Sequence, residues 1–199
     1  TSPLATVTEV DREAIAAGPL RQGRPVPGIE LRGVTKDGGV QAWDGVDLGE
    51  LQVRGPWVAK SYYESPDAAS AFDDGWLKTG DIVTIDPSGS ILIVDRAKDL
   101  VKSGGEWIST IALETALSAH PAVLEAAVIA MPDAQWGERP LALVVQNAAA
   151  PKSTERELLA HLGAQFPKWY LPDAVRFVES LPKTGTGKID KKALRRTHA

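Results

Sequence analysis

The first half of the chain alternates apolar and polar residues in short runs that end at glycine. Residues 28–33 and 49–55 are each bounded by glycines, as is typical of half-buried antiparallel strands. Residues 81–86 and 91–94 flank the sequence Pro-Ser-Gly-Ser, which predicts a hairpin with a four-residue turn. Residues 65–72 alone have a helical pattern. We therefore expect residues 1–95 to be rich in strands.

The second half interleaves strand and helix patterns. Thr154 followed by Glu157 forms a capping-box pattern that opens a helix whose apolar residues run to Phe166. A second helix is predicted over 109–119, a short basic one over 190–196, and strands over 123–131, 140–146 and 174–178. The pattern predicts an α+β domain of about 100 residues, which we assign to residues 96–199, with the boundary near 95–98.

Composition narrows the class of protein without naming a function. The chain has 199 residues, 43% of them apolar, a net charge of −4 and no cysteine. Disulfides, zinc-thiolate sites and a thiol nucleophile are thereby excluded, and nothing favours a nucleic-acid or membrane partner. The three histidines lack a metal-like spacing, so we assign no metal ligand, and we expect a cytoplasmic protein without a transmembrane segment.

A lysine at the end of a glycine-threonine loop is the first candidate for chemistry. The loop runs from Pro182 to Lys188 with the sequence PKTGTGK. It is not a P-loop, because Pro182 stands where that motif needs glycine and Ile189 where it needs a hydroxyl. A lysine here can meet an oxyanion; the alternative is a solvated turn ahead of a surface helix.

Two further segments carry charge beside glycine. Asp81 follows Thr79-Gly80, and a carboxylate can accept hydrogen bonds from the hydroxyls of a ribose. Residues 95–106 (DRAKDLVKSGGE) place Arg96 and a double glycine at the predicted boundary. The alternatives are a turn before a strand for Asp81 and a charged linker leading into a helix for residues 95–106.

Four motifs occur in a fixed order: WLKTGD at 76–81, DRAKDLVKSGGEWIS at 95–109, WGERP at 136–140 and PKTGTGKIDK at 182–191. In this order the chain closely resembles the adenylate-forming acyl-CoA synthetases, and within them the medium- to long-chain fatty-acid–CoA ligases. The resemblance implies an α+β fold in which residues 1–95 are the distorted, barrel-like end of a large domain. Residues 96–199 would be a small, mobile α+β lid domain.

The resemblance also implies a two-step reaction with ATP and CoA. A carboxylic acid attacks the α-phosphate of ATP to give an acyl-AMP, and the CoA thiol then displaces AMP. Lys188 would assist the first step and Lys102 the second. Asp81 and Arg96 would hold the ribose, Lys98 would be the hinge, and the pair Gly104 and Gly105 would line the path of the pantetheine.

Three positions depart from the family pattern. Asp95 replaces a usual glycine, Lys98 replaces a common aspartate, and Ala112 replaces an acidic residue that would complete a capping box with Ser109. The family's phosphate loop and acyl pocket belong upstream of Thr1, as does its Mg²⁺ site, so we expect this chain to be a piece without ligase activity of its own. The alternatives are an adenylating enzyme that loads a carrier protein, or a non-catalytic lid or binding module.

Overall fold

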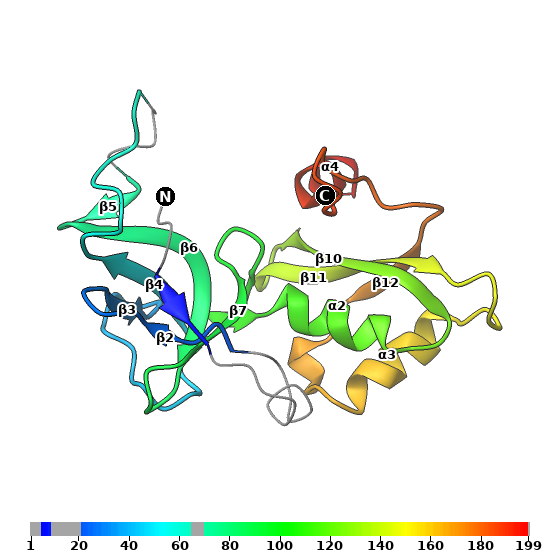
Figure 1. Cartoon of the computed structure of the whole chain (residues 1–199). Helices are drawn as coiled ribbons and strands as arrows, with labels where there is room; N and C mark the ends of the chain where they lie inside the picture. Colours follow the sequence, from blue (N-terminus) through cyan, green and yellow to red (C-terminus); the bar gives the residue numbers. More distant parts are fainter. Residues whose placement is uncertain (1–4, 9–20, 65–69, 199) are drawn as a thin grey trace. The chain divides into compact units, whose positions relative to one another are not determined.

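The chain forms two compact units, Thr1–Lys98 and Asp99–Ala199 (Figure 1). The computed structural model describes residues 5–8, 21–64 and 70–198. Each unit has its own sheet and its own apolar core. The architecture is therefore α+β, with a strand-rich first unit and a mixed second unit.

The first unit contains one curled five-stranded antiparallel sheet (Figure 1) and a separate two-stranded sheet formed by β1 and β2. The strand order of the five-stranded sheet is β3-β4-β6-β5, and β7 pairs with β6 on a further edge. The core lies on one face and includes Leu51, Val53, Leu77, Val83 and Ile85. The strands are β1 (Thr6–Val7), β2 (Arg24–Pro25), β3 (Glu30–Val34), β4 (Gly49–Arg54), β5 (Phe72–Asp73), β6 (Trp76–Ile85) and β7 (Ile91–Arg96).

The strands and the hairpin predicted for this unit are confirmed, whereas the helix at 65–72 is not. In the hairpin turn, the Asp86 carboxylate accepts from the backbone N–H groups of Ser88 and Ser90. The Ser88 hydroxyl holds the pKa of Asp86 below its ordinary value. Residues 65–69 lie outside the described residues, but Phe72 begins β5. A helix ending at Phe72 was therefore wrong, because Phe72 pairs with Leu77 of β6 instead.

The second unit is a sheet with helices on both faces (Figure 1). The strand order is β10-β11-β8-β9, and β12 runs parallel to β11. Helices α2 and α3 cover one face and α4 covers the other. The elements are β8 (Val101–Ser103), β9 (Glu106–Ile108), α2 (Thr110–Ser118), β10 (Val123–Asp133), β11 (Gly137–Gln146), α3 (Glu155–Gly163), the 3-10 turn η1 (Lys168–Tyr170), β12 (Ala174–Phe177) and α4 (Lys191–His198).

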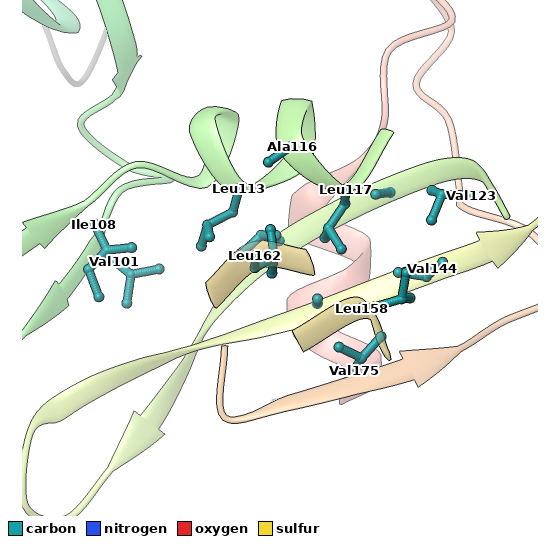
Figure 2. Close-up of a cluster of buried hydrophobic side chains, with 13 residues drawn as sticks. Val101, Ile108, Leu113, Ala116, Leu117, Val123, Val144, Leu158, Leu162 and Val175 are labelled. Carbon is teal, nitrogen blue, oxygen red and sulfur yellow. The ribbon is translucent and has the colours of Figure 1, made fainter. Parts of the chain in front are cut away.

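Strand β10 is apolar at consecutive positions because both of its faces are buried. Val128 belongs to the same core cluster as Leu113, Leu117 and Leu162 of α2 and α3, and Figure 2 shows these three leucines. The neighbouring Ile129 faces the opposite way and packs with Leu194 of α4. The continuous apolar run at 126–131 thus reflects a three-layer arrangement of helix, sheet and helix.

The start of α3 is fixed by the predicted capping box. The Thr154 hydroxyl accepts from the Glu157 N–H, and the Glu157 carboxylate accepts from the Thr154 N–H at 2.7 Å. That backbone bond, with further bonds from the Thr154 and Ser153 hydroxyls, keeps the pKa of Glu157 below its ordinary value. The helix ends at Gly163 rather than reaching Phe166. Phe166 lies beyond the helix, where its ring stacks on the Tyr170 ring with 5.0 Å between the ring centroids.

The start of α2 has only half of a local cap, and a distant tyrosine supplies the other half. The Ser109 side chain accepts from the Ala112 N–H, as an N-cap does. The Ser109 N–H, which a glutamate at 112 would have satisfied, donates to the Tyr170 hydroxyl at 2.7 Å. The departure at Ala112 is thus compensated through tertiary structure.

We expect Tyr170→Phe to lower the free energy of unfolding by about 1–2 kcal/mol, because the buried Ser109 N–H loses its acceptor. Adding Ala112→Glu should recover most of this loss by completing the capping box. Urea unfolding of the single and double variants measures both effects. Tyr63→Phe, at a residue that is 88% exposed, is the control and should change nothing. If Tyr170→Phe lowers the free energy of unfolding equally with and without Ala112→Glu, the Tyr170 hydroxyl does not replace the missing glutamate of the capping box.

Candidate functional site

Asp81 lies in a bulge inside β6 rather than in a turn ahead of the strand. Glu50 pairs with Ile82 and Gln52 with Lys78, so residues 79–81 stand opposite Leu51 alone. Gly80 takes the left-handed backbone that the bulge needs, with φ of +72°. The Thr79 hydroxyl secures the bulge by donating to the Leu51 carbonyl and accepting from the Asp81 N–H. The expected glycine turn is therefore corrected to a bulge.

The bulge brings Asp81 directly opposite Arg96 of β7. The two residues are register partners, and their side chains form an ion pair. The Asp81 side chain is 19% exposed and that of Arg96 is 49% exposed. A β-carbon added at Gly80 would meet no atom within 4 Å. The carboxylate and guanidinium therefore border open space where a polar ligand can approach.

Asp95 and Lys98 flank this pair. Asp95 is 1% exposed, and its carboxylate accepts from the Arg96 N–H at 2.7 Å. Lys98 is exposed in the turn that follows β7, at the last residue of the first unit. The departure at Asp95 thus fixes the backbone beside Arg96, and Lys98 lies where the chain leaves one unit for the other.

Lys102, Gly104 and Gly105 lie in the hairpin formed by β8 and β9. Both glycines have positive φ, +58° and +86°, as a two-residue type I′ turn requires. Ser103 pairs with Glu106 across the turn, so the double glycine does not lead straight into a helix as the linker interpretation expected. Lys102 is exposed on β8. The hairpin presents the glycine turn and Lys102 to solvent.

Lys188 lies at the end of the loop of a second hairpin, and this loop is longer than the glycine turn. Lys183 and Ile189 form an antiparallel bridge, and the Thr184 N–H donates to the Lys188 carbonyl at 2.7 Å. The stem is also tied to the edge strand β10 by an ion pair between Lys183 and Glu125 at 2.5 Å. Residues 182–188 are exposed except for these contacts. The Lys188 ammonium is therefore presented to solvent from a fixed stem.

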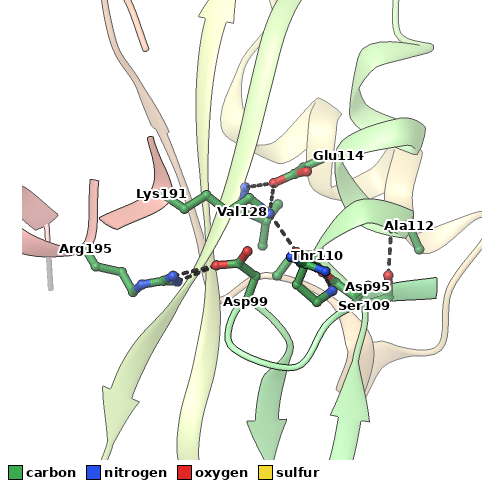
Figure 3. A network of polar contacts seen from close by, with 10 residues as sticks. Asp95, Asp99, Ser109, Thr110, Ala112, Glu114, Val128, Lys191 and Arg195 are labelled. Atoms are coloured by element: carbon green, nitrogen blue, oxygen red, sulfur yellow. Dashed lines mark hydrogen bonds and ion pairs between the residues drawn. The ribbon is translucent and has the colours of Figure 1, made fainter. Parts of the chain in front are cut away.

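Helix α4 anchors the downstream side of the Lys188 loop (Figure 3). Its Lys191 contacts the Glu114 carboxylate at 2.6 Å and the Thr110 hydroxyl at 2.7 Å. Glu114 also accepts from the Val128 N–H on the edge strand β10, at 2.7 Å. These contacts join α2 and α4 around the edge of the sheet and cover one of its free N–H groups.

A second contact ties α4 to the start of the second unit. Both Nη atoms of Arg195 donate to one Asp99 carboxylate oxygen, at 2.5 and 3.1 Å (Figure 3). Asp99 directly follows Lys98. The loop that carries Lys188 and the first residue of the second unit are therefore parts of one connected body.

A cleft of about 550 Å³ opens beside the glycine turn of the second unit. Gly104, Trp136 and Trp169 contribute apolar surface, and Arg139 and Lys168 contribute positive charge. Glu106, Asp133 and Asp173 also line it. A cleft of this size, with apolar surface and charges of both signs, suits an elongated organic ligand.

Glu138 and Arg139 were identified from the sequence only as parts of a motif, without an individual role. Glu138 and Arg139 belong to the WGERP motif, yet the structure shows them bonded to the β8 hairpin. Asp99 and Arg195 were not singled out as a pair, because 96 positions separate them. The WGERP motif was the sequence feature that could have singled out Glu138 and Arg139. No local sequence pattern indicated that Asp99 and Arg195 form a pair.

The structure also bears on the metal. Over the described ranges, no group of three or more His, Asp or Glu side chains could hold a metal ion. Asp81, whose side chain is only partly exposed, is already paired with Arg96. These residues do not fit Mg²⁺. No described helix is long and apolar enough to cross a membrane.

The comparisons decide the family. Residues 112–188 match the family model of the AMP-binding enzyme C-terminal domain. Over 197 residues the chain is 45% identical to a long-chain-fatty-acid–CoA ligase of Thermus thermophilus, a match that covers 98% of the chain and 36% of the relative. The chain belongs to the adenylate-forming enzymes.

Two further comparisons agree with this family. The chain is 48% identical over 174 residues to a 3-methylmercaptopropionyl-CoA ligase of Ruegeria lacuscaerulensis, covering 87% of the chain and 32% of the relative. The ATP-bound structure of MatB from Rhodopseudomonas palustris superposes with a TM-score of 0.79 at 35% identity, covering 89% of the chain and 35% of that structure. The chain thus spans about a third of the length of these relatives.

Proposed function

We propose that this chain is the C-terminal part of an acyl-CoA ligase that activates a medium- or long-chain fatty acid with ATP and transfers it to CoA. In the first step a carboxylate oxygen attacks the α-phosphorus of ATP, and the bond to pyrophosphate breaks. In the second step the CoA thiolate attacks the acyl carbon, and AMP leaves with the electron pair of the broken C–O bond. The thiol proton passes to solvent.

The ion pair in the first unit supports a role in nucleotide binding. The Asp81 carboxylate can accept hydrogen bonds from both ribose hydroxyls, and Arg96 orients it and can donate to the same ribose. Lys188 supplies a positive charge for the developing negative charge on the α-phosphate. The observation that carries the proposal is the Asp81–Arg96 pair in the open bulge, in a chain that also carries Lys188 on a fixed stem.

The hairpin of the second unit supports the role in thioester formation. The glycine turn leaves room for the thin pantetheine arm, and the cleft beside it offers the exposed Lys168 to the phosphates of CoA. Lys102 is exposed on the same hairpin. Rotation of the second unit about Lys98 would bring Lys188 to the substrate in one step and the glycine turn in the other.

The proposal is tested by acid-dependent release of pyrophosphate with ATP, CoA and a chain-length series of fatty acids. This chain is assayed beside the full-length protein that contains it. We expect activity in the full-length protein only, because residues that hold the triphosphate and Mg²⁺ are assigned to the part upstream. Absence of pyrophosphate release in both proteins would contradict the ligase function, and turnover by this chain alone would contradict its dependence on the upstream part.

We also propose a cytoplasmic location.

We expect Asp81→Asn in the full-length protein to raise the KM for ATP by about 10–100-fold, because a charged hydrogen-bond acceptor for the ribose is lost. The measurement is the ATP dependence of pyrophosphate release at saturating fatty acid. Asp86→Asn is the matched control, since Asp86 lies in the turn of the same β6–β7 hairpin and bonds only within its own unit. Its KM for ATP should stay unchanged, and an unchanged KM for Asp81→Asn would remove Asp81 from the nucleotide site.

A further inference from the structure

The segment Trp136–Arg139, which is Trp136 followed by the first three residues of β11, contacts three successive residues of the β8 hairpin. The Glu138 carboxylate accepts from the Lys102 N–H at 2.8 Å. Arg139 donates to the Ser103 hydroxyl at 3.1 Å. The Trp136 carbonyl accepts from the Gly104 N–H at 2.8 Å. The segment that precedes the glycine turn is thus held residue by residue.

The indole of Trp136 adds a packing contact. A β-carbon added at Gly104 would lie 2.8 Å from its ring, so the glycine backbone rests directly against the indole. A side chain at position 104 could not form without moving the ring. Trp136 therefore limits how closely the glycine turn can approach β11, and Gly104 allows the backbone to touch the ring because it has no side chain.

Arg139 connects the hairpin to the rest of the unit. Its guanidinium also donates to the carbonyls of Trp169 and Leu171 and to the Asp173 carboxylate, at 2.8–2.9 Å. Nε, Nη1 and Nη2 are all engaged, and the side chain is only 13% exposed. A planar guanidinium with hydrogen bonds at all three nitrogens holds its partners in fixed directions, and the single ammonium of a lysine cannot reproduce this geometry.

The turn end of the hairpin needs this support, because only the base of the hairpin is packed in the apolar core, through the buried Val101 and Ile108. Strands β8 and β9 span three residues each, and β8 meets the rest of the sheet at the single register pair Gly137–Ser103. Lys102, Gly104 and Gly105 are exposed. Without the contacts from Trp136–Arg139, the hairpin would keep its apolar base and its internal pairing, but the glycine turn would lose the contacts that fix its position.

We propose that Glu138 and Arg139 are positioning residues for transfer of the acyl group to CoA. They act through Lys102 and Ser103, by fixing where the glycine turn lies when the pantetheine passes it. This inference rests on the proposed function and deepens its second step. Lys188, which serves the first step, is held by a separate set of contacts from β10 and α4. The two half-reactions should therefore respond differently to substitution.

The experiment measures both half-reactions in the full-length protein: acyl-AMP formation from ATP and fatty acid, and CoA transfer from supplied acyl-AMP. We expect Glu138→Ala and Arg139→Lys to slow transfer or raise the KM for CoA by about tenfold or more, with acyl-AMP formation changed less than about twofold. Glu138→Gln keeps an acceptor for the Lys102 N–H and should retain most of the transfer rate. Arg176→Ala, an exposed arginine on β12, is the matched control.

Ser103→Ala separates positioning from direct contact, because Arg139 also lines the cleft. It removes the Arg139 partner on the hairpin and leaves Arg139 in place, so it should also slow transfer. Loss of transfer in Arg139→Lys alone would mean that Arg139 binds CoA directly, and this would overturn the proposal. Equal loss of both half-reactions, or of neither, would also overturn it. An unmodified protein inactive in both assays would instead refute the proposed function.

Discussion

Replacing Lys188 by alanine in the full-length protein should slow acyl-AMP formation by about 100–1000-fold, the usual loss when one charge-stabilising group is removed from a transition state. Transfer of the acyl group from supplied acyl-AMP to CoA should change less than about twofold. Lys188 is exposed at the end of its stem, so the substitution removes a charge without opening a core. Single-turnover assays of each step measure the two rates.

Lys192→Ala is the matched control for this prediction. Lys192 is also exposed, and it lies on α4 four positions after Lys188. Its removal subtracts the same charge from the same region and should leave both steps unchanged. Similar losses in Lys188→Ala and Lys192→Ala would show that the general positive charge of this end matters, rather than the loop lysine. A loss of less than about threefold in Lys188→Ala would remove it from the first step.

Replacing Gly105 by leucine should reduce CoA transfer by about 100-fold while leaving acyl-AMP formation intact. A β-carbon at Gly105 meets no atom within 4 Å, so the new side chain enters open space beside the turn, where we place the pantetheine. Position 104 gives a less clear test, because any side chain there collides with Trp136. The measurement is again transfer from supplied acyl-AMP.

The backbone cost of this substitution has its own control. Gly105 has φ of +86°, where a leucine costs about 1–2 kcal/mol. Gly38 has φ of +82° and equally open surroundings, in a turn of the first unit to which we assign no role. Gly38→Leu should therefore lower stability by a similar amount and leave CoA transfer unchanged. Equal transfer in both variants would contradict the assignment of Gly105 to the pantetheine path.

Features set by neighbouring residues could be predicted from the sequence. The capping box at Thr154 and the hairpin turn after Asp86 depend on side chains that bond within four positions, so their patterns are visible locally. The β8–β9 hairpin was missed because its strands are too short to show an alternating period. The same two glycines therefore fitted both a flexible linker and a type I′ turn.

Features set by distant residues could not be predicted in this way. The pairing of Asp81 with Arg96 depends on a bulge whose register no local pattern specifies, and only the family resemblance joined the two residues. The Tyr170 hydroxyl that caps α2 comes from 61 positions downstream. An alanine at 112 signalled a weak helix start, but the sequence offered no way to find what replaced the missing carboxylate.

The covering of the second sheet face by α4 has a consequence for synthesis of the protein on the ribosome. The strands β10, β11 and β12 are all translated before Leu194, which closes the apolar face formed by residues such as Ile129 and Leu143. A nascent chain therefore exposes that apolar face, together with the edge strand β10, until helix α4 emerges from the ribosome. Chaperones that bind exposed apolar segments would find their target during this interval, and a chain terminated before Leu194 would retain it permanently.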